Sequence, residues 1–249
     1  SEEEVLRVEH LGRKGGFNDV SFTLKKGDVL GITGLLGSGR GEIGEALFGL
    51  APADEGKIFL NGKELSIQSV DDAIRNEIGY VPEDRLTQGL FMDRSIRDNT
   101  VVASIRRYMK HLRLDEQEME DAAMHWIKEI DIKAPSPRPA VRTLSGGNAQ
   151  KVVIAKWLNT APKLFILDGP TVGVDIGAKA EIHAILHELA GRGIGIIVIS
   201  DDLPELVQNC NKILVMKDGM SSGIIDNSID EISLGKLLIG AEKGGTVHE

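Results

Sequence analysis

Hydrophobic residues along this chain gather into short runs separated by polar turns, which is the spacing of buried strands. The runs predict strands at residues 5–9, 20–24, 28–33, 56–60, 78–81, 164–167, 195–199 and 212–216. Stretches between them predict helices at residues 42–48, 178–190 and 203–210. After residue 151 strands and helices alternate, which predicts a parallel, doubly wound α/β sheet with helices on both faces. Asn61-Gly62, directly after the strand at 56–60, predicts a tight hairpin turn.

The stretch from residue 83 to 140 differs from the rest, because it is rich in charge and follows helical spacing. In residues 115–130 the apolar side chains recur at helical intervals, at Met119, Ala122, Ala123, Trp126, Ile127 and Ile130. Prolines at 135, 137 and 139 then interrupt the helical pattern. We therefore predict an α/β core from residues 1–82 and 141–240, an inserted helical subdomain at 83–140 and a flexible tail at 241–249.

Composition narrows the class of protein. With 249 residues, 41% hydrophobic and 4% aromatic, the chain can build one large domain, or a core with a subdomain, around aliphatic side chains. The net charge of −9 argues against nucleic acid as a partner, because phosphate contacts need clustered cations. The single cysteine, Cys210, excludes an internal disulfide and fits a reducing cytosol. The longest apolar runs, such as 194–199, are far too short to span a bilayer.

A glycine-rich loop joins the strand at 28–33 to the following helix. Residues 34–41 read GLLGSGRG, and their spacing matches the phosphate-binding loop G-x-x-x-x-G-K-[ST] except at the last two positions. Glycines let the backbone turn its N–H groups toward a phosphate, and the helix N-terminus adds a positive dipole. Arg40 replaces a compact ammonium with a planar fork, and Gly41 removes the hydroxyl that would bind Mg²⁺. The loop alone fits a phosphate site and an ordinary strand-to-helix turn equally well. Its candidate contacts are Gly34, Gly37, Ser38, Gly39, Arg40 and Gly41.

Further motifs follow in the order of one protein family. Residues 144–151 (LSGGNAQK) resemble the signature motif of the ABC transporter ATPases, 165–168 (FILD) resemble their Walker B strand, and 173–175 (GVD) resemble their D-loop. Residues 78–85 (IGYVPEDR) and 198–203 (VISDDL) fall where the family has its Q-loop and its switch histidine. The resemblance covers about residues 5–240. It implies a P-loop NTPase fold, in which a mixed sheet has a parallel, RecA-like part and an antiparallel part, with an inserted α-helical subdomain.

Within the family, the chain is similar to the tandem ATPases that serve bacterial importers of monosaccharides such as ribose, galactose and arabinose. The similarity rests on Asn148 and Lys151 in the signature, on the tripeptide at 83–85 and on the arginine of the phosphate loop. In those proteins two ATPase halves are fused, and the arginine-type loop is characteristic of the second half. The resemblance therefore implies a C-terminal half that acts in ATP-driven carbohydrate uptake. The start at Ser1 without a methionine is expected for a piece of a longer protein, and also after methionine removal.

The same resemblance implies the partners and the place of action. A second ABC ATPase half, fused upstream, would share the nucleotide sites, and integral membrane permease subunits would form the pathway. A periplasmic sugar-binding protein would take part indirectly. The chain would lie peripherally at the cytoplasmic face of the cell membrane. The sugar itself is not implied, because selectivity resides in other subunits.

The resemblance also implies that the chain's own nucleotide site is altered. Around ATP and Mg²⁺ the family places a lysine, a hydroxyl, an aspartate, a glutamate, a glutamine and a histidine. This chain has at those positions Arg40, Gly41, Asp168, Gly169, Glu83 and Asp201. Only the metal ligand Asp168 is unchanged, the site gains one negative charge, and Gly169 departs even from the sub-family. Since phosphoryl transfer depends on positioned charges, we expect the site to hydrolyse ATP poorly or not at all.

The signature, by contrast, is complete. Ser145, Gly146 and Gly147 would open a helix whose N–H groups, with the serine hydroxyl, face the γ-phosphate of ATP held by the partner half. Further candidates for nucleotide contact are Gln150 and Asp175. The alternative is a helix that is capped by Ser145 and binds no ligand.

Three other groups of residues have competing interpretations. His183 and His187 have the spacing of metal ligands on a helix, but no cysteine or third histidine lies near them in sequence, which favours surface positions. Residues 12–16 lack the aromatic side chain on which the family stacks adenine, and Phe17 is predicted to fill the core instead. Residues 90–92 could dock a permease subunit or pack inside, and the sequence favours neither.

Two rival functions belong to other classes. One is a non-hydrolysing module that serves only dimerisation and docking. The other is a soluble ABC ATPase of DNA repair or translation, which the net charge of −9 and the sugar-importer features of the signature disfavour.

Overall fold

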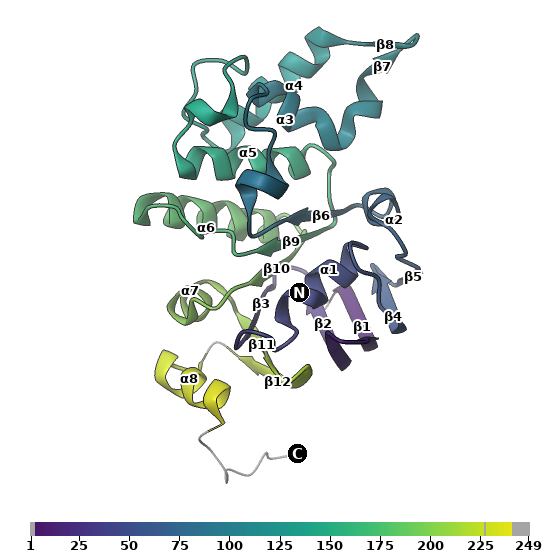
Figure 1. Ribbon diagram of the computed structural model, residues 1–249, viewed down its shortest axis with the longest axis vertical. Coiled ribbons are helices and arrows are strands. Elements are labelled where there is room, and N and C mark those ends of the chain that lie inside the picture. The colour runs from purple at the N-terminus through teal and green to yellow at the C-terminus, as the bar shows by residue number, and fades with distance from the viewer. Residues whose placement is uncertain (1–2, 227, 241–249) are drawn as a thin grey trace.

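The structure, a computed structural model, describes residues 3–226 and 228–240 and is built around two main sheets (Figure 1). The larger sheet has the strand order β12-β11-β3-β10-β9-β6. Its parallel strands are β11 (Lys212–Lys217), β3 (Val29–Gly34), β10 (Gly195–Ile199), β9 (Leu164–Asp168) and β6 (Ile78–Val81). β12 (Met220–Asp226) pairs antiparallel at one edge. The parallel order confirms the predicted doubly wound core.

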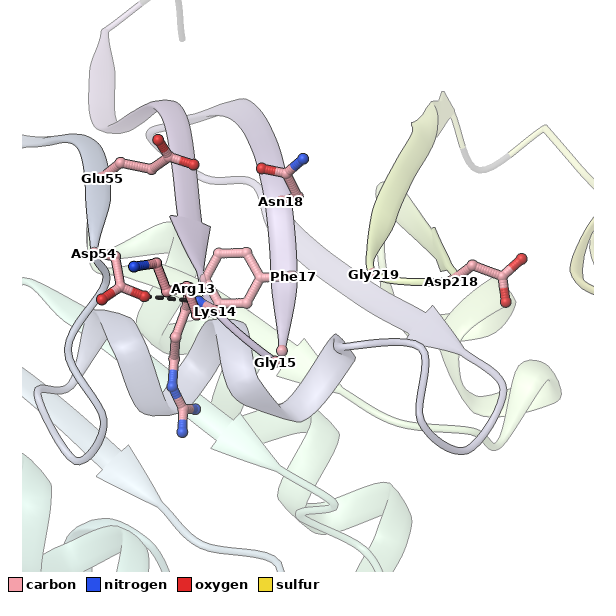
Figure 2. A pocket seen from close by; sticks show the side chains of 10 residues that line it. Arg13, Lys14, Gly15, Phe17, Asn18, Asp54, Glu55, Asp218 and Gly219 are labelled. Carbon is pink, nitrogen blue, oxygen red and sulfur yellow. Dashed lines mark hydrogen bonds between the residues drawn. The ribbon is translucent and has the colours of Figure 1, made fainter.

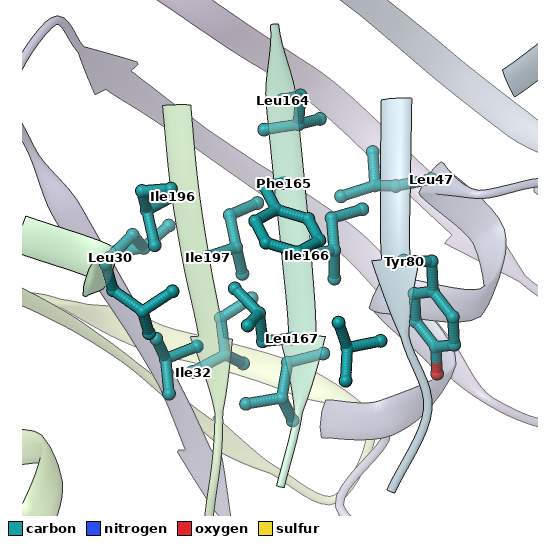
Figure 3. Packing of buried hydrophobic residues seen from close by; sticks show 14 of the residues in the cluster. Leu30, Ile32, Leu47, Tyr80, Leu164, Phe165, Ile166, Leu167, Ile196 and Ile197 are labelled. Carbon is teal, nitrogen blue, oxygen red and sulfur yellow. The ribbon is translucent and has the colours of Figure 1, made fainter. Parts of the chain in front are cut away.

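Helices cover both faces of this sheet, as predicted. α1 (Arg40–Leu47) packs so closely on one face that a Cβ atom on Gly44 would lie 2.6 Å from Ile199 Cδ1. α7 (Leu203–Asn209) covers the other face, where a Cβ atom on Gly31 would lie 3.0 Å from Leu206 Cδ2. Gly31 pairs in register with Val198, and successive residues of a strand point to opposite faces. Figure 3 shows the aliphatic layer between the helices, formed by side chains of β3, β9 and β10.

The smaller sheet is antiparallel and has the order β2-β1-β4-β5. Its strands are β2 (Phe17–Lys25), β1 (Glu4–Arg13), β4 (Glu55–Leu60) and β5 (Lys63–Leu65). Asn61 and Gly62, with φ angles of 49° and 76°, form the turn between β4 and β5 and confirm the predicted hairpin. This sheet is the antiparallel part of the mixed fold.

The chain between β6 and β9 is mainly helical. Its elements are η1 (Arg85–Gly89), α3 (Ile96–Val101), η2 (Val102–Tyr108), β7 (Met109–Lys110), β8 (Arg113–Leu114), α4 (Glu116–Glu129), η3 (Val141–Thr143) and α5 (Gly146–Leu158). α4 buries Met119, Ala123 and Ile127, as their spacing predicts. Figure 1 shows α3, α4 and the β7–β8 hairpin together at the end of the molecule far from β12, with α5 between them and α6 (Ile176–Gly191).

The elements that hydrophobic spacing does not predict include α2 (Val70–Arg75), β12 and α8 (Glu231–Ile239). β12 is an edge strand whose side chains are exposed or half-buried, so it lacks the alternation of a half-buried strand. α8 begins at the cap Asp230, whose carboxylate accepts a hydrogen bond from the backbone N–H of Ser233. The predicted tail at 241–249 lies outside the described residues.

Candidate functional site

The phosphate loop connects the end of β3 to the start of α1. Gly37 and Gly39 have φ angles of 78° and 90°, which is backbone that favours glycine. A Cβ atom on Gly34 would lie 2.2 Å from Ser38 Oγ, so the loop is folded tightly on itself. The Ser38 hydroxyl is buried and has no hydrogen-bond partner within the described part of the chain. The loop thus keeps the backbone shape of a phosphate cradle at a helix N-terminus.

Both terminal nitrogens of Arg40 already have hydrogen-bond partners within the chain. Its Nη1 donates a hydrogen bond to the carbonyl of Gly34, and its Nη2 lies 3.1 Å from Asp201 Oδ2. Asp201 follows β10, so the structure brings two of the substituted positions of this site together. The Arg40 side chain is 19% exposed and that of Asp201 is 74% exposed. A phosphate entering the loop would therefore compete with a carboxylate for the loop's cation.

Asp168 stands at the end of β9, facing the first turn of α1. A Cβ atom on Gly41 would lie 3.6 Å from Asp168 Oδ2, so a hydroxyl at position 41 would point toward this carboxylate. Gly41 provides no side-chain ligand there. Among the described residues no group of three or more His, Cys, Asp or Glu side chains could hold a metal ion. Asp168 is thus left without the neighbouring hydroxyl that would share a Mg²⁺ ion with it.

Asp168 is also difficult to ionise. Burial, and then the nearby charge of Glu83, raise the pKa of Asp168 from 3.8 to about 6, although Arg40 acts in the opposite direction. The hydroxyl of Tyr80 donates a hydrogen bond of 3.4 Å to Asp168 Oδ2. Burial, and then the charge of Asp168, raise the pKa of Tyr80, which keeps this phenol a donor.

Gly169 and Glu83 are in contact. Gly169 has a φ angle of 54°, and a Cβ atom there would lie 3.0 Å from Val172 Cγ2 and 3.1 Å from Glu83 Cγ. Glu83 also borders, with Tyr80 and Asp168, a hollow of about 560 Å³. The substituted positions 83 and 169 thus gather with the unchanged Asp168 at the carboxyl ends of β6 and β9, where ligands bind in open α/β sheets.

The signature residues form the exposed N-terminus of α5. Ser145 Oγ accepts hydrogen bonds from the backbone N–H of Asn148 at 3.4 Å and from Asn148 Nδ2 at 2.9 Å. The capping role considered from the sequence is therefore present. A Cβ atom on Gly147 would lie 2.4 Å from that of Ala178, so only glycine lets α5 approach α6 here. Asp175 caps α6 beside this point, accepting a 2.9 Å hydrogen bond from the Ala178 N–H.

Gln150 is not at this surface. It is only 2% exposed, and it lies one turn inside α5. The prediction that Gln150 contacts nucleotide therefore does not fit this structure. Lys151 is similarly buried, and its Nζ donates to Glu181 Oε2 at 2.6 Å and to the Asp131 carbonyl at 2.9 Å. Both residues belong to the packing of α5.

The prediction that both histidines of α6 lie at the surface is wrong for His183. His183 is buried, and its Nε2 lies 2.7 Å from Glu205 Oε1, whereas His187 is exposed. Glu205 also accepts hydrogen bonds from the hydroxyls of Thr171, at 2.6 Å, and Ser200, at 3.0 Å. Burial opposes ionisation of Glu205, but these hydrogen bonds hold its pKa below the usual value. No pattern in the sequence predicts this network, which joins the segments after β9 and β10.

A second hollow, of about 610 Å³, lies beside the phosphate loop between β1, β2, the start of β4 and the β11–β12 turn (Figure 2). Phe17 is 4% exposed, which confirms its predicted place in the core. The backbone N–H of Lys14 donates a 2.7 Å hydrogen bond to Asp54 Oδ2. The Gly16 carbonyl lies so close to Gly39 that a Cβ atom on Gly39 would be 2.6 Å from the Gly16 oxygen. The hollow therefore adjoins the cradle.

The sequence left open whether residues 90–92 pack inside or form a docking surface, and the structure shows both kinds of position. Leu90 is buried and Met92 is half-buried, but Phe91 is 60% exposed. Asn99 fixes the Phe91 backbone, with hydrogen bonds of 2.8 Å to its N–H and 3.0 Å to its carbonyl. Phe91 borders an open apolar hollow of about 380 Å³, whose other apolar members are Val101, Val102, Ile105, Leu114 and Met119.

Asp168→Asn is expected to stabilise the nucleotide-free chain. A carboxyl whose pKa rises from 3.8 to about 6 on folding destabilises the folded state fully above pH 6 and not at all below pH 3.8. The variant should gain up to about 3 kcal/mol of unfolding free energy at pH 7.5, shrinking as the pH falls toward 5. Urea unfolding at pH 7.5 and at pH 5 measures this difference in unfolding free energy. Asp93→Asn, at an exposed carboxylate, is the control and should change little. Equal or lower stability of Asp168→Asn at pH 7.5 would contradict the burial argument.

Comparison with known proteins identifies the class of this fold and site. Residues 17–172 match the sequence model of the family described as ABC transporter. Because the match covers more than half of the chain, the protein belongs to the ABC transporter family. In a nucleotide-free ATP-binding cassette from an ABC transporter, the fold matches with a TM-score of 0.79 at 24% identity, covering 93% of this chain and 95% of that one. A dimeric bacterial ABC transporter cassette matches with a TM-score of 0.75 at 21% identity, covering 90% and 100%.

Among curated proteins, the chain is 42% identical over 219 residues to the ribose import ATP-binding protein RbsA of Bacillus licheniformis, which covers 88% of this chain and 44% of that protein. It is 43% identical over 224 residues to ribose import ATP-binding protein RbsA 2 of Rhizobium johnstonii, with 90% and 44% covered. The chain thus spans less than half the length of these relatives. Within residues 3–226 and 228–240, no helix has the length and apolar character needed to cross a bilayer.

Proposed function

We propose that this chain is the C-terminal nucleotide-binding half of a tandem ATPase that drives carbohydrate import. Its signature completes the ATP site of the partner half, while its own site hydrolyses ATP slowly or not at all. The names of the relatives support carbohydrate import, and the share of their length that the chain spans supports a half of a longer protein. The C-terminal position is proposed from the arginine of the phosphate loop, Arg40. We also propose residues 83–140 as the inserted helical subdomain of this half.

The proposal rests mainly on the difference between the chain's own nucleotide site, which is altered, and its signature helix, which is intact. Arg40, the cation of the phosphate loop, already pairs with Asp201 and with a backbone carbonyl. Gly41 and Gly169 lack the hydroxyl and carboxylate that would hold a metal and orient water. Ser145, in contrast, is exposed at the N-terminus of a 13-residue helix, where the helix dipole favours a phosphate.

The partners follow from the same assignment. The dimeric cassette among the similar structures supports pairing with a second ATPase half. Phe91 and the apolar hollow beside it offer a docking surface for an integral membrane permease subunit, because a large exposed aromatic beside an apolar hollow suits a protein contact. The chain would then lie at the cytoplasmic face of the membrane, and a periplasmic sugar-binding protein would act through the permease. Nucleic acid is not a proposed partner.

The isolated chain is expected to be nearly inactive as an ATPase. Its steady-state turnover at saturating Mg²⁺-ATP should fall at least about 100-fold below the ~1–10 s⁻¹ of ordinary enzymes, because the metal-binding hydroxyl at position 41 and the water-orienting carboxylate at position 169 are both missing. A coupled phosphate-release assay measures this rate. The full tandem protein with its permease is the positive control. Turnover of the isolated chain in the ordinary range would show that its own site is functional.

Two further observations separate the rivals. Co-purification of the tandem protein with a membrane permease favours the importer over a soluble ATPase of DNA repair or translation. Turnover of the tandem protein that depends on Ser145 favours a working half-site over a module that only dimerises and docks.

A further inference from the structure

Arg85 joins the segment after β6 to the segment after β9. Its Nη1 donates a 2.6 Å hydrogen bond to the carbonyl of Val172, and its Nη2 donates a 3.0 Å hydrogen bond to the carbonyl of Gly173. The guanidinium therefore spans two consecutive carbonyls with its two terminal nitrogens. A lysine ammonium is a compact charge and cannot reproduce that planar fork.

The same guanidinium touches the start of the signature helix. A Cβ atom on Gly146 would lie 3.1 Å from Arg85 Nη2 and 3.1 Å from the Gly173 carbonyl. Gly173 has a φ angle of 68°, and a Cβ atom there would lie 3.4 Å from Arg85 Nη2. Three segments that are distant in sequence thus meet at one side chain, and glycines at 146 and 173 make room for it.

The segment η1, which carries Arg85, is held by hydrogen bonds at both of its ends. Asp84 caps η1, because its carboxylate accepts hydrogen bonds from the backbone N–H groups of Leu86 and Thr87, at 3.1 and 3.2 Å. At the other end of η1, the Gly89 carbonyl accepts a 2.6 Å hydrogen bond from Lys156 Nζ, a buried group of α5. The segment 84–89 is therefore fastened to α5 at one end and, through Arg85, to residues 172 and 173 at the other.

We propose that Arg85 is a positioning residue for the signature half-site. It holds the carbonyls of residues 172 and 173 against the N-terminus of α5, so that Ser145 and its neighbouring N–H groups keep the geometry needed to meet a γ-phosphate. It also ties that half-site to Glu83, two residues away, which borders the chain's own site. This inference rests on the proposed function, in which the signature completes the partner's ATP site.

The test uses the full tandem protein with its permease. Arg85→Lys keeps the charge but loses the fork, and it should lower kcat for ATP about 10- to 100-fold, the scale expected when a contacting group is displaced by about 1 Å. Equilibrium binding of ATP to the partner half should change less than about threefold, because that half's own loop supplies most of the binding. The matched control is Arg142→Lys, at an arginine paired across an exposed surface with Asp93, which should leave both values unchanged.

The outcomes are distinct. A wild-type kcat for Arg85→Lys would overturn the inference, and so would equal losses of kcat and of equilibrium ATP binding, since those would mean general damage to the fold. Ser145→Arg in the same preparation distinguishes failure of the proposed half-site from failure of the role of Arg85. If Ser145→Arg leaves turnover unchanged, the proposed half-site fails. If Ser145→Arg abolishes turnover while Arg85→Lys does not reduce it, only the role of Arg85 fails.

Discussion

Ser145→Arg in the full tandem protein is expected to abolish ATP hydrolysis at the partner's site. Ser145 is the exposed N-cap of the signature helix α5, so an arginine there would fill the space into which the γ-phosphate must move. The variant also loses the hydroxyl that caps α5, which costs about 1 kcal/mol and cannot by itself unfold the chain. We expect kcat to fall by at least about 100-fold, the scale reported for removal of one charge-stabilising donor.

Gly146→Asp should have the same effect for a different reason. A negative charge at the helix N-terminus would repel the phosphate and offset the attraction of the helix dipole for it. Its Cβ atom would also meet Arg85 Nη2 and the Gly173 carbonyl, both at 3.1 Å. The assay is ATP turnover of the tandem protein with its permease.

The matched control for Ser145→Arg is Ser69→Arg, which places the same side chain at the serine that caps α2. It should cost stability through a lost cap but leave turnover near wild type. Wild-type turnover in both signature variants would mean that this helix N-terminus does not complete a nucleotide site. Equal loss of turnover in Ser69→Arg would mean that a lost cap alone explains the effect.

Gly169→Glu alone is not expected to restore hydrolysis at the chain's own site. A carboxylate can orient water only where the metal and the γ-phosphate are already held, and Gly41 still offers no ligand. The backbone at 169 has a φ angle of 54°, so any side chain there is strained by about 1–2 kcal/mol. The new carboxylate would also stand against Glu83, whose Cγ lies 3.1 Å from the position of the Cβ atom.

Recovery should need several changes made together. Gly41→Thr places a hydroxyl toward Asp168, Glu83→Gln removes the charge beside position 169, and Asp201→His removes the carboxylate that pairs with Arg40. With Gly169→Glu these changes should act non-additively, since they assemble one site, and Arg40→Lys should add a further gain. The measurement uses the tandem protein with the partner's own Walker site inactivated, so that only this site can turn over.

Gly169→Ala is the control for strain, because it introduces a Cβ atom without a carboxylate. It should lower stability about as much as Gly169→Glu, apart from the repulsion by Glu83. Robust turnover of the single variant Gly169→Glu would show that the site lacked one residue only, and it would refute the argument from charge and metal ligation.

The sequence by itself determined the core and the order of the motifs. β3, β9 and β10 are buried on both faces, so each is a run of mostly apolar residues, and such runs can be recognised in the sequence alone. The phosphate loop was visible because its tight backbone turn requires glycine at 37 and 39. The signature was visible only through its resemblance to the family motif, because its Gly147 is required by the packing of α5 on α6. The exposed edge strand β12 was not, since an edge strand with few buried side chains carries little periodic signal.

Only the tertiary structure decided which side chains meet. Arg40 and Asp201 are 161 residues apart, and Arg85 reaches carbonyls 87 and 88 residues away, so no local pattern predicts either contact. The burial of His183 and the exposure of His187 are also not predicted by a local pattern, although both residues lie in one helix. Their spacing places them on one side of α6, yet His183 is buried because Glu205 of α7 packs against it, while His187 remains exposed. Burial depends on the element that packs opposite, and in this fold that element comes from a distant part of the chain.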